Sequence, residues 1–186
     1  LFPYTTLFRS FPHIVYTNST HSQADNIYGV SKRRAAEILS HAAAKQQGRF
    51  TNLILPHVFG EFGKPFYNSV VSTFCHQLAA GEEPRITHDG RLNLVHVQVV
   101  AARCIEAIEK NQVNEQVLEG RCMQVSELLV RLQRMHKHYA EQQLIPPLDD
   151  PLDLALFNTL RSYRYPAKAQ VPLTVHSDNR GYLFEA

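Results

Sequence analysis

The hydrophobic pattern of the chain opens with an apolar strand, a long helix and a second apolar strand. Residues 11–17 form a short apolar run with several β-branched side chains, and residues 50–55 form another. Between them, apolar side chains recur at helical spacing over residues 26–47, and Gly48 is typical of the end of a helix. Uninterrupted apolar runs are typical of strands buried in a parallel sheet. The pattern therefore predicts an α/β fold that contains a βαβ unit with a right-handed crossover.

The rest of the chain continues with short strands and amphipathic helices. Helices are predicted over residues 69–80, 98–109, 126–139 and 152–163, and short strands over residues 85–87, 92–97 and 116–118. Asp89 and Gly90 lie between the first two of these strands, which predicts a hairpin. Residues 175–185 contain a turn flanked by strand-like segments. Prolines and aspartates gather at residues 145–151, which indicates a linker or domain edge.

Both ends of the sequence differ from its middle. Residues 1–10 have no helical or strand period and match the translated read-through of a common sequencing-library adapter, so we expect an artefact there. The other end stops within a strand-like segment. We therefore predict a fragment of a longer protein, with one domain at 11–145, a linker and short helix at 146–173, and a truncated domain that starts at 174–186.

Composition and charge exclude several classes of function. The 186 residues are 44% hydrophobic, which is enough for one core of ordinary size. The formal net charge of +2 is too small for a nucleic-acid-binding surface, and we interpret the basic residues 32–34 as a solvated helix face. No apolar run reaches the roughly 20 residues of a membrane span. Three widely spaced cysteines and scattered histidines indicate reduced thiols, a cytoplasmic protein and no metal site.

Candidate chemistry lies where the first predicted strand passes into the first predicted helix. Tyr28 and Lys32 are four residues apart, so in a helix they share a face, one turn from each other. A fixed ammonium next to a phenol favours the phenolate, which lets a tyrosine exchange its proton near neutral pH. Ser19 follows the strand and could hydrogen-bond the oxygen that gains or loses this proton. The combination, rather than the spacing alone, predicts the interconversion of an alcohol and a ketone.

Three segments together resemble the extended short-chain dehydrogenase/reductase superfamily, which includes the NAD-dependent epimerases and dehydratases. They are the strand hydroxyl with Tyr28-x-x-x-Lys32, the turn Pro56-His57-Val58-Phe59-Gly60, and Leu94-Val95-His96-Val97-Gln98. More narrowly, residues 63–75 are similar to a branch that makes capsule and O-antigen sugars and joins a nucleotide-sugar reductase to a C-terminal cupin. Residues 176–181 look like the entry strand of that cupin. The resemblance implies the C-terminal portion of a Rossmann-like, doubly wound parallel sheet.

The resemblance also implies roles for individual residues. Tyr28 would be the general acid–base, and Lys32 would hold the ribose of the cofactor and favour ionisation of the tyrosine. Ser19 would hydrogen-bond the substrate oxygen, and Thr20 is the alternative and a candidate for substrate binding. The remaining candidates are Pro56, His57 and Val58 beside the nicotinamide, Lys64, Tyr67 and Asn68 over the sugar nucleotide, and Arg91 at its diphosphate.

The implied activity is the reduction of a UDP-linked 4-keto-6-deoxy-N-acetylhexosamine with NADPH or NADH, of which NADPH is favoured. A UDP-sugar 4-epimerase and a non-catalytic nucleotide-binding relative remain as alternatives. Thr20-His21-Ser22 stands where dehydratases carry an acidic pair, which disfavours dehydration, and Tyr28 disfavours a protein that only binds. Related enzymes pair through the tyrosine-bearing helix, so we expect a homodimer of the full-length protein.

The sequence also departs from the superfamily pattern. His57 stands where the turn usually carries Asn, Val99 where the later segment carries Asp, and Ile54 where Arg is common. No Gly-x-x-Gly-x-x-Gly, the loop that brings backbone N–H groups to a cofactor pyrophosphate, occurs in the chain. We therefore expect the 186-residue chain alone neither to bind the cofactor usefully nor to turn over.

Overall fold

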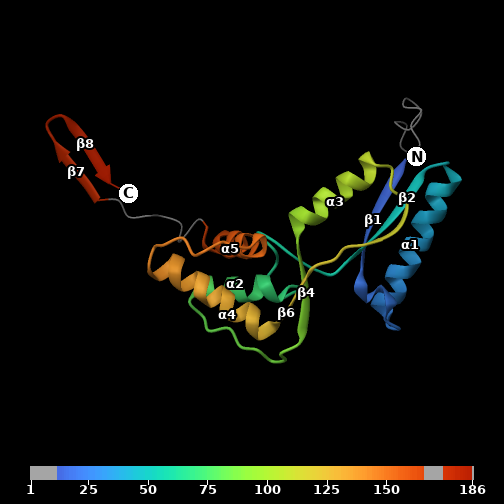
Figure 1. Cartoon of the computed structure of the whole chain (residues 1–186), viewed down its shortest axis with the longest axis horizontal. Helices are drawn as coiled ribbons and strands as arrows, with labels where there is room; N and C mark the ends of the chain where they lie inside the picture. Colours follow the sequence, from blue (N-terminus) through green and yellow to red (C-terminus); the bar gives the residue numbers. More distant parts are fainter. Residues whose placement is uncertain (1–11, 166–173, 186) are drawn as a thin grey trace. The chain divides into compact units, whose positions relative to one another are not determined.

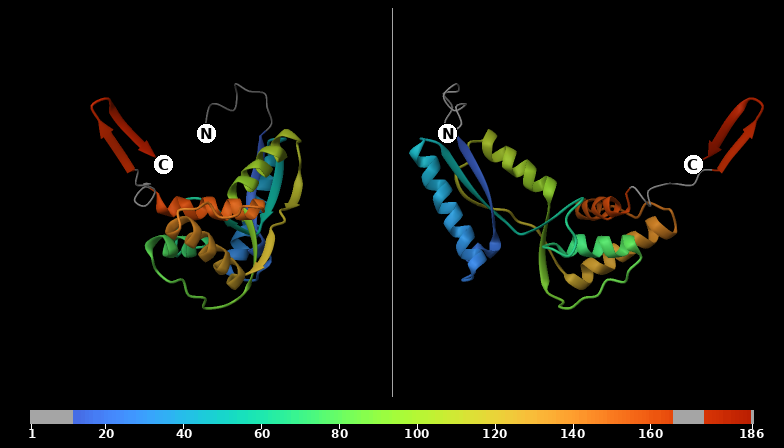
Figure 2. Two further views of the ribbon diagram at one scale, coloured as in Figure 1. Left: turned by 60° about the vertical axis from the view of Figure 1, so that its left-hand side comes forward. Right: turned by 180° about the vertical axis from the view of Figure 1, so that it is seen from behind.

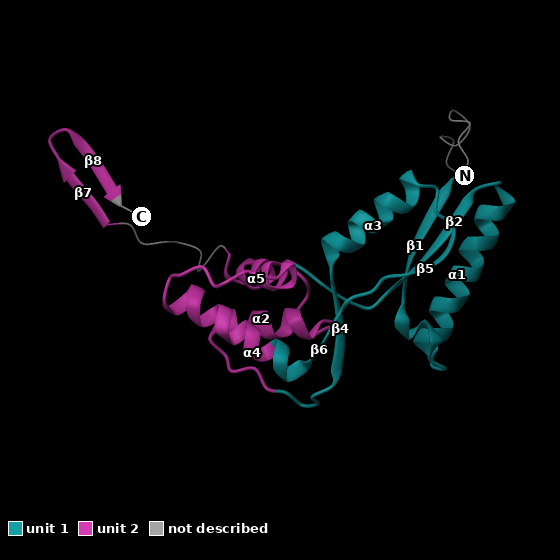
Figure 3. Ribbon diagram, viewed as in Figure 1, with its two compact units in different colours: residues 1–60, 86–128 teal, residues 61–85, 129–186 magenta. Residues whose placement is uncertain are grey.

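The computed structural model describes residues 12–165 and 174–185, which fall into two compact units (Figure 1, Figure 3). Unit 1 takes the residues up to Gly60 together with Ile86–Leu128, and unit 2 takes Glu61–Arg85 together with the residues from Leu129 onward. Each unit therefore combines segments that are far apart in the sequence, and each is described by itself.

A three-stranded parallel sheet is the framework of unit 1. Its strands are β1 (His13–Ser19), β2 (Arg49–Leu55) and β5 (Asn114–Val117), in the order β1-β2-β5. Helix α1 (Ile27–Lys45) connects β1 to β2, as the βαβ pattern predicts. The register pairs Ser19 with Leu55, so β1 and β2 end at the same edge of the sheet. The predicted α/β class with a parallel sheet is confirmed.

Helices cover both faces of this sheet. Lys32 of α1 lies over the ring of Tyr16, while Val100 of α3 (Val97–Glu109) packs against Leu53. Tyr16 is paired with Asn52, so the next residue, Leu53, points to the opposite face because neighbouring strand residues alternate. Figure 2 accordingly shows α1 and α3 on opposite sides of β1 and β2.

A second, smaller sheet in unit 1 replaces the hairpin that the sequence predicts. It contains β3 (His57–Phe59), β4 (Arg91–His96) and β6 (Arg121–Gln124), with β3 parallel and β6 antiparallel to β4. Residues 85–87 form no strand. Asp89 instead accepts hydrogen bonds from the backbone N–H and the hydroxyl of Ser126, both at 2.8 Å. The predicted hairpin is wrong because this carboxylate caps a helix N-terminus rather than a turn.

The end of α1 also differs from the prediction. Gln47, with φ at 52°, takes the left-handed position, and the N–H of Gly48 donates to the carbonyl of Ala43 at 2.8 Å. Gly48 is required for another reason: a Cβ there would lie 2.4 Å from the carbonyl oxygen of Pro12.

The described part of unit 2 contains three α-helices. They are α2 (Val70–Ala80), α4 (Val125–His136), which begins in unit 1, and α5 (Pro151–Arg164). Helices α2 and α5 pack together, and their buried side chains include Val71, Phe74, Leu78, Leu156, Phe157 and Leu160. Arg131 of α4 pairs with the buried Asp153 of α5 at 3.0 Å. Helix α4 ends earlier than predicted and passes into a π-helical turn, Lys137–Glu141.

The last described residues form the predicted pair of strands around a turn. β7 (Thr174–Asp178) and β8 (Gly181–Glu185) are antiparallel, and Thr174 is paired with Glu185. The interpretation of this hairpin as the entry to a cupin stays a prediction, as do the domain boundaries. The adapter-like residues 1–10 and residues 166–173 of the predicted linker lie outside the described residues.

The three cysteines of the chain differ in their exposure to solvent. Cys75 is buried, Cys104 is half-buried and Cys122 is exposed, and all three are free thiols. Burial raises the pKa of the Cys75 thiol.

None of the helices in the described part of the chain combines the length and apolar character that crossing a membrane requires.

Candidate active site

The corner between β1 and α1 carries the candidate catalytic residues. Ser19 ends β1 and caps the short 3-10 helix Thr20–Gln23, because its Oγ accepts the N–H of His21 at 3.1 Å. Asn26 then caps α1 by accepting the N–H of Gly29 at 2.8 Å. Two capping side chains thus fix the path of the backbone from the strand into the helix.

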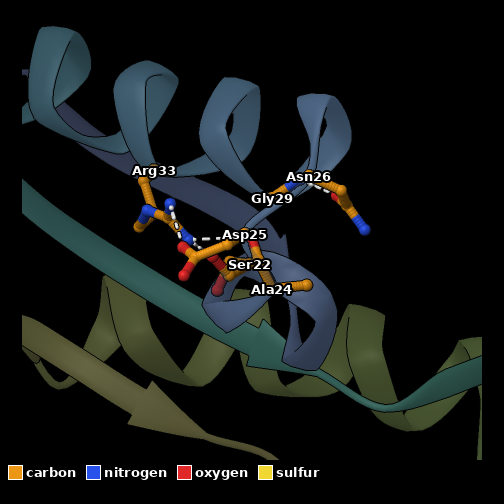
Figure 4. A network of polar contacts seen from close by, with 6 residues as sticks. All are labelled: Ser22, Ala24, Asp25, Asn26, Gly29 and Arg33. Carbon is orange, nitrogen blue, oxygen red and sulfur yellow. Dashed lines mark hydrogen bonds and ion pairs between the residues drawn. The ribbon is translucent and has the colours of Figure 1, made fainter.

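Arg33 of α1 reaches back along the chain and binds the residues that precede the helix (Figure 4). Its Nη1 donates to the carbonyl oxygens of Ser22 at 2.5 Å and Ala24 at 3.1 Å, and its Nη2 lies 3.3 Å from the carboxylate of Asp25. The interpretation of residues 32–34 as a solvated face is therefore wrong for Arg33, which is half-buried, whereas Arg34 is exposed. Gly29 completes the corner, since a Cβ there would lie 2.1 Å from the carbonyl oxygen of Ala24.

The fixed corner presents Tyr28 and Lys32 on one face of α1, as their spacing predicts. The Lys32 Nζ lies 5.8 Å from the centroid of the Tyr28 ring and 5.3 Å from that of Tyr16. Both distances are within the range of cation–π contacts. Tyr28 is 51% exposed, so its phenol is accessible to a ligand, while Lys32 is half-buried. Tyr16 is not among the site residues predicted from the sequence. Its ring lies on β1 and contacts Lys32 from the side of the sheet.

A chain of amides supports Ser19 from within the sheet. The N–H of Ser19 donates to Oδ1 of the buried Asn18 at 2.8 Å. Asn18 donates to Asn52 at 3.1 Å, and Asn52 donates to the carboxylate of Glu115 at 2.9 Å. The network joins β1, β2 and β5. Its sequence signal is an asparagine inside each of two apolar strands, which the sequence motifs of the site do not include.

The turn Pro56-His57-Val58 lies at the same edge of the sheet. Pro56 follows Leu55, the strand partner of Ser19, and His57 opens β3. The rings of His21 and His57 meet edge to face with centroids 5.7 Å apart. Partial burial of the imidazole, and secondarily the charge of His21, lower the pKa of His57. The parallel register therefore brings Ser19, Thr20 and this turn to one end of the sheet.

A close backbone approach fixes the end of that turn. A Cβ at Gly60 would lie 2.5 Å from Cγ1 of Val97, the first residue of α3, and the ring of Phe59 packs against His96 at 5.3 Å. The turn thus contacts the β4–α3 connection at Phe59, and the missing side chain of Gly60 leaves room there for the Val97 side chain.

The other substrate-binding candidates occupy different places. Arg91 is exposed and is the first residue of β4, at the amino end of a strand that runs parallel to β3. Lys64, Tyr67 and Asn68 are exposed residues of unit 2, where Lys64 Nζ lies 5.3 Å from the Tyr67 ring centroid. The catalytic and nicotinamide candidates thus share unit 1, and the roles of all these residues stay predictions.

No group of three or more His, Cys, Asp or Glu side chains among the described residues is arranged to hold a metal ion. The corner also carries the hydroxyls of Ser19 and Tyr28 and the ammonium of Lys32, groups that are suited to hydrogen bonding and proton transfer.

Comparison with known proteins identifies the family. The model of the NAD dependent epimerase/dehydratase family matches residues 8–119, more than half of the chain. The chain belongs to this family. The match includes the β1–α1 corner and the Pro56–Val58 turn, so the resemblance stated from the sequence motifs is confirmed.

Two relatives agree with the narrower, capsule-sugar branch of the family. The chain is 29% identical over 181 residues to UDP-2-acetamido-2,6-beta-L-arabino-hexul-4-ose reductase of Pseudomonas aeruginosa, which covers 95% of this chain and 48% of that protein. It is also similar to the capsular polysaccharide assembling protein CapF of Staphylococcus aureus, with a TM-score of 0.77 and 28% identity over 96% of this chain and 51% of that one. The chain spans about half the length of each relative.

A more distant structure supports the fold. UDP-glucose 4-epimerase of Thermotoga maritima, solved with UDP-glucose, has a TM-score of 0.67 at 19% identity and covers 82% of this chain and 63% of that one. At this identity the likeness shows the fold alone. Together with CapF it confirms the predicted Rossmann-like architecture.

Proposed function

We propose that the full-length protein is an NAD(P)H-dependent reductase of a UDP-linked 4-keto-6-deoxy-N-acetylhexosamine. The observation that carries the proposal is the corner of unit 1, where an exposed phenol stands beside an ammonium next to a strand that ends in a hydroxyl. The similarity to a UDP-sugar 4-ulose reductase over 95% of the chain favours reduction over the other activities of the family.

The residues of the corner fit a nicotinamide cofactor. Ligands of open α/β sheets bind at the carboxyl ends of strands, which is where Ser19 and the Pro56–Val58 turn lie. Lys32 carries three N–H donors, which suit ribose hydroxyl groups. When bound, the cofactor would supply a hydride to the keto carbon of the sugar. Partial burial and the charge of His21 lower the pKa of His57, which favours the neutral imidazole in the position proposed to lie beside the nicotinamide.

The proton of the reaction would come from Tyr28. As the keto carbon gains a hydride, its oxygen develops negative charge and takes the phenolic proton, which yields the alcohol. Lys32 would stabilise the phenolate that remains. Ser19 uses an oxygen lone pair to cap the 3-10 helix, and its hydroxyl proton would donate to the same substrate oxygen.

Pairing of two subunits through α1 is part of the same proposal. Three apolar side chains on this helix are exposed, namely Ile27 at 92%, Val30 at 52% and Ile38 at 56%. Burial of such a stripe against a second copy would remove it from water.

The test is keto-sugar-dependent oxidation of NADPH by the full-length protein and its Tyr28→Phe variant. Loss of a general acid typically costs about 10²–10⁴-fold in kcat, so we expect a loss in this range with the KM for the sugar changed little. Interconversion of UDP-sugars without net consumption of NADPH would instead support a 4-epimerase. A Tyr28→Phe variant with the wild-type rate would contradict the mechanism.

The isolated chain provides a second test. It lacks a glycine-rich loop, so we expect no binding of NADPH at micromolar concentrations to the 186-residue chain. A micromolar dissociation constant, measured by titration calorimetry, would show that the C-terminal portion alone holds the cofactor.

A further inference from the structure

The loop between β3 and α2, residues 61–68, contains two phenylalanines in the left-handed backbone conformation. The φ angle is 58° at Phe62 and 55° at Phe66. Side chains with a Cβ reach this region at an energetic cost that the surrounding structure must offset. The cost is not recovered by burial, because Phe62 is 75% and Phe66 64% exposed. Strain combined with exposed aromatic rings is typical of a binding element rather than of a core.

Each of these phenylalanines is held by a hydroxyl from a helix. The N–H of Phe62 donates to Ser162 Oγ of α5 at 3.2 Å, and the N–H of Phe66 donates to Thr73 Oγ1 of α2 at 3.0 Å. Both hydroxyls donate their only proton to a nearby backbone carbonyl, Ser162 to that of Thr159 at 2.7 Å and Thr73 to that of Ser69, the N-cap residue of α2, at 3.0 Å. Their oxygens are therefore oriented as acceptors toward the loop.

The loop also bonds to Tyr163 of α5 and lies beside a cavity of unit 2. The hydroxyl of Tyr163 donates to the carbonyl oxygen of Gly63, next to Phe62. Phe62 and Ser162 line an open cavity of about 340 Å³. Its other lining residues are one acidic, two basic and three neutral polar or aromatic ones, namely Glu61, Arg161, Arg164, Tyr139, Asn158 and Tyr165. This volume lies within the roughly 300–1,000 Å³ of small-molecule sites, and aromatic faces with a guanidinium suit a nucleobase, sugar or phosphate.

We propose that Ser162 and Thr73 are positioning residues that hold the 61–68 loop so that Phe62 and Phe66 contact the sugar nucleotide. The inference rests on the proposed function, since it takes a nucleotide sugar as the ligand. It goes beyond the sequence candidates Lys64, Tyr67 and Asn68, because the two hydroxyls lie outside the loop and act through its backbone.

The test measures the dissociation constant of UDP-N-acetylglucosamine for the full-length protein with NADPH present. We expect Ser162→Ala and Thr73→Val each to weaken binding about fivefold to tenfold and to accelerate amide exchange at Phe62 or Phe66, respectively. Ser162→Thr and Thr73→Ser retain the hydroxyl and should restore both values. Thr159→Val is the matched control, because this buried α5 hydroxyl bonds only to the Ala155 carbonyl in its own helix.

Turnover separates this inference from the proposed function. With a keto-sugar substrate, the two variants should raise the KM for the sugar and leave kcat and the KM for NADPH within about twofold. Absence of keto-sugar reduction by the wild type would contradict the proposed function. The binding and amide-exchange measurements would still test whether Ser162 and Thr73 position the loop. Unchanged affinity, unchanged exchange, or the same loss in Thr159→Val would overturn the positioning role.

Discussion

The β1–α1 corner and the 61–68 loop both carry candidate site residues, but their backbones are held in different ways. At the corner, the caps from Ser19 and Asn26 come from residues two or three positions away, and Arg33 reaches back 8 to 11 positions. In the loop, the hydroxyl that holds Phe62 and the one that holds Gly63 both come from 100 residues further along the chain, while the hydroxyl that holds Phe66 comes from seven residues away.

The difference also extends to strain. The residues of the corner with a Cβ have negative φ angles, and its one crowded position, Gly29, is occupied by the residue that fits. The loop instead keeps two phenylalanines at positive φ. We infer that contacts from nearby residues hold most of the corner, whereas the Phe62 end of the loop depends on α5.

The strongest test of a locally fixed corner is Arg33→Met. It removes the hydrogen bonds to Ser22 and Ala24 and the ion pair with Asp25, so we expect the free energy of unfolding of the chain to fall by about 1–2 kcal/mol. Urea unfolding followed by circular dichroism measures it. Arg34→Met is the matched control, because its pair with Glu37 is exposed, and should cost less than about 0.5 kcal/mol. Equal losses in both variants would show that Arg33 does not fix the corner.

In the loop, we expect a substitution that increases the free energy of unfolding, opposite to the effect of Arg33→Met. Asn tolerates the left-handed region better than Phe, so Phe62→Asn should stabilise unit 2 by about 0.5 kcal/mol while weakening the binding of UDP-N-acetylglucosamine. The matched substitution Phe59→Asn, at a buried β3 residue, should destabilise instead. Thermal unfolding and calorimetric titration report the two quantities. Destabilisation by Phe62→Asn would show that the positive φ at Phe62 does not strain the backbone.

The same contrast explains what the sequence could and could not predict. The βαβ unit, the shared face of Tyr28 and Lys32 and the strand end at Ser19 follow from periodicity and spacing, which are local. The sequence does not predict β3 and β6, because strands of three and four residues carry too little periodicity for a dependable prediction. It predicts a turn at Asp89 because the partner of this carboxylate, Ser126, lies 37 positions away. Arg33 was assigned to solvent because its neighbours are also basic, although Gly29 already indicated a close approach on that side.

The smallest expected effect concerns pH and the His21–His57 contact, which joins the corner to the Pro56–Val58 turn. Because burial and His21 lower the pKa of His57 below 6.5, the unfolded chain binds more protons than the folded one between that lowered pKa and 6.5. Stability should therefore rise with pH through this window and be lost on acidification. His57→Asn, which gives the turn its usual residue, should reduce this loss by a few tenths of a kcal/mol, since the ring is partly solvated. His41→Asn, on the exposed side of α1, is the control. The free energy of unfolding is measured at pH 5 and pH 7.5 for both variants. If the two variants change its pH dependence equally, the contact between His21 and His57 does not contribute to that dependence.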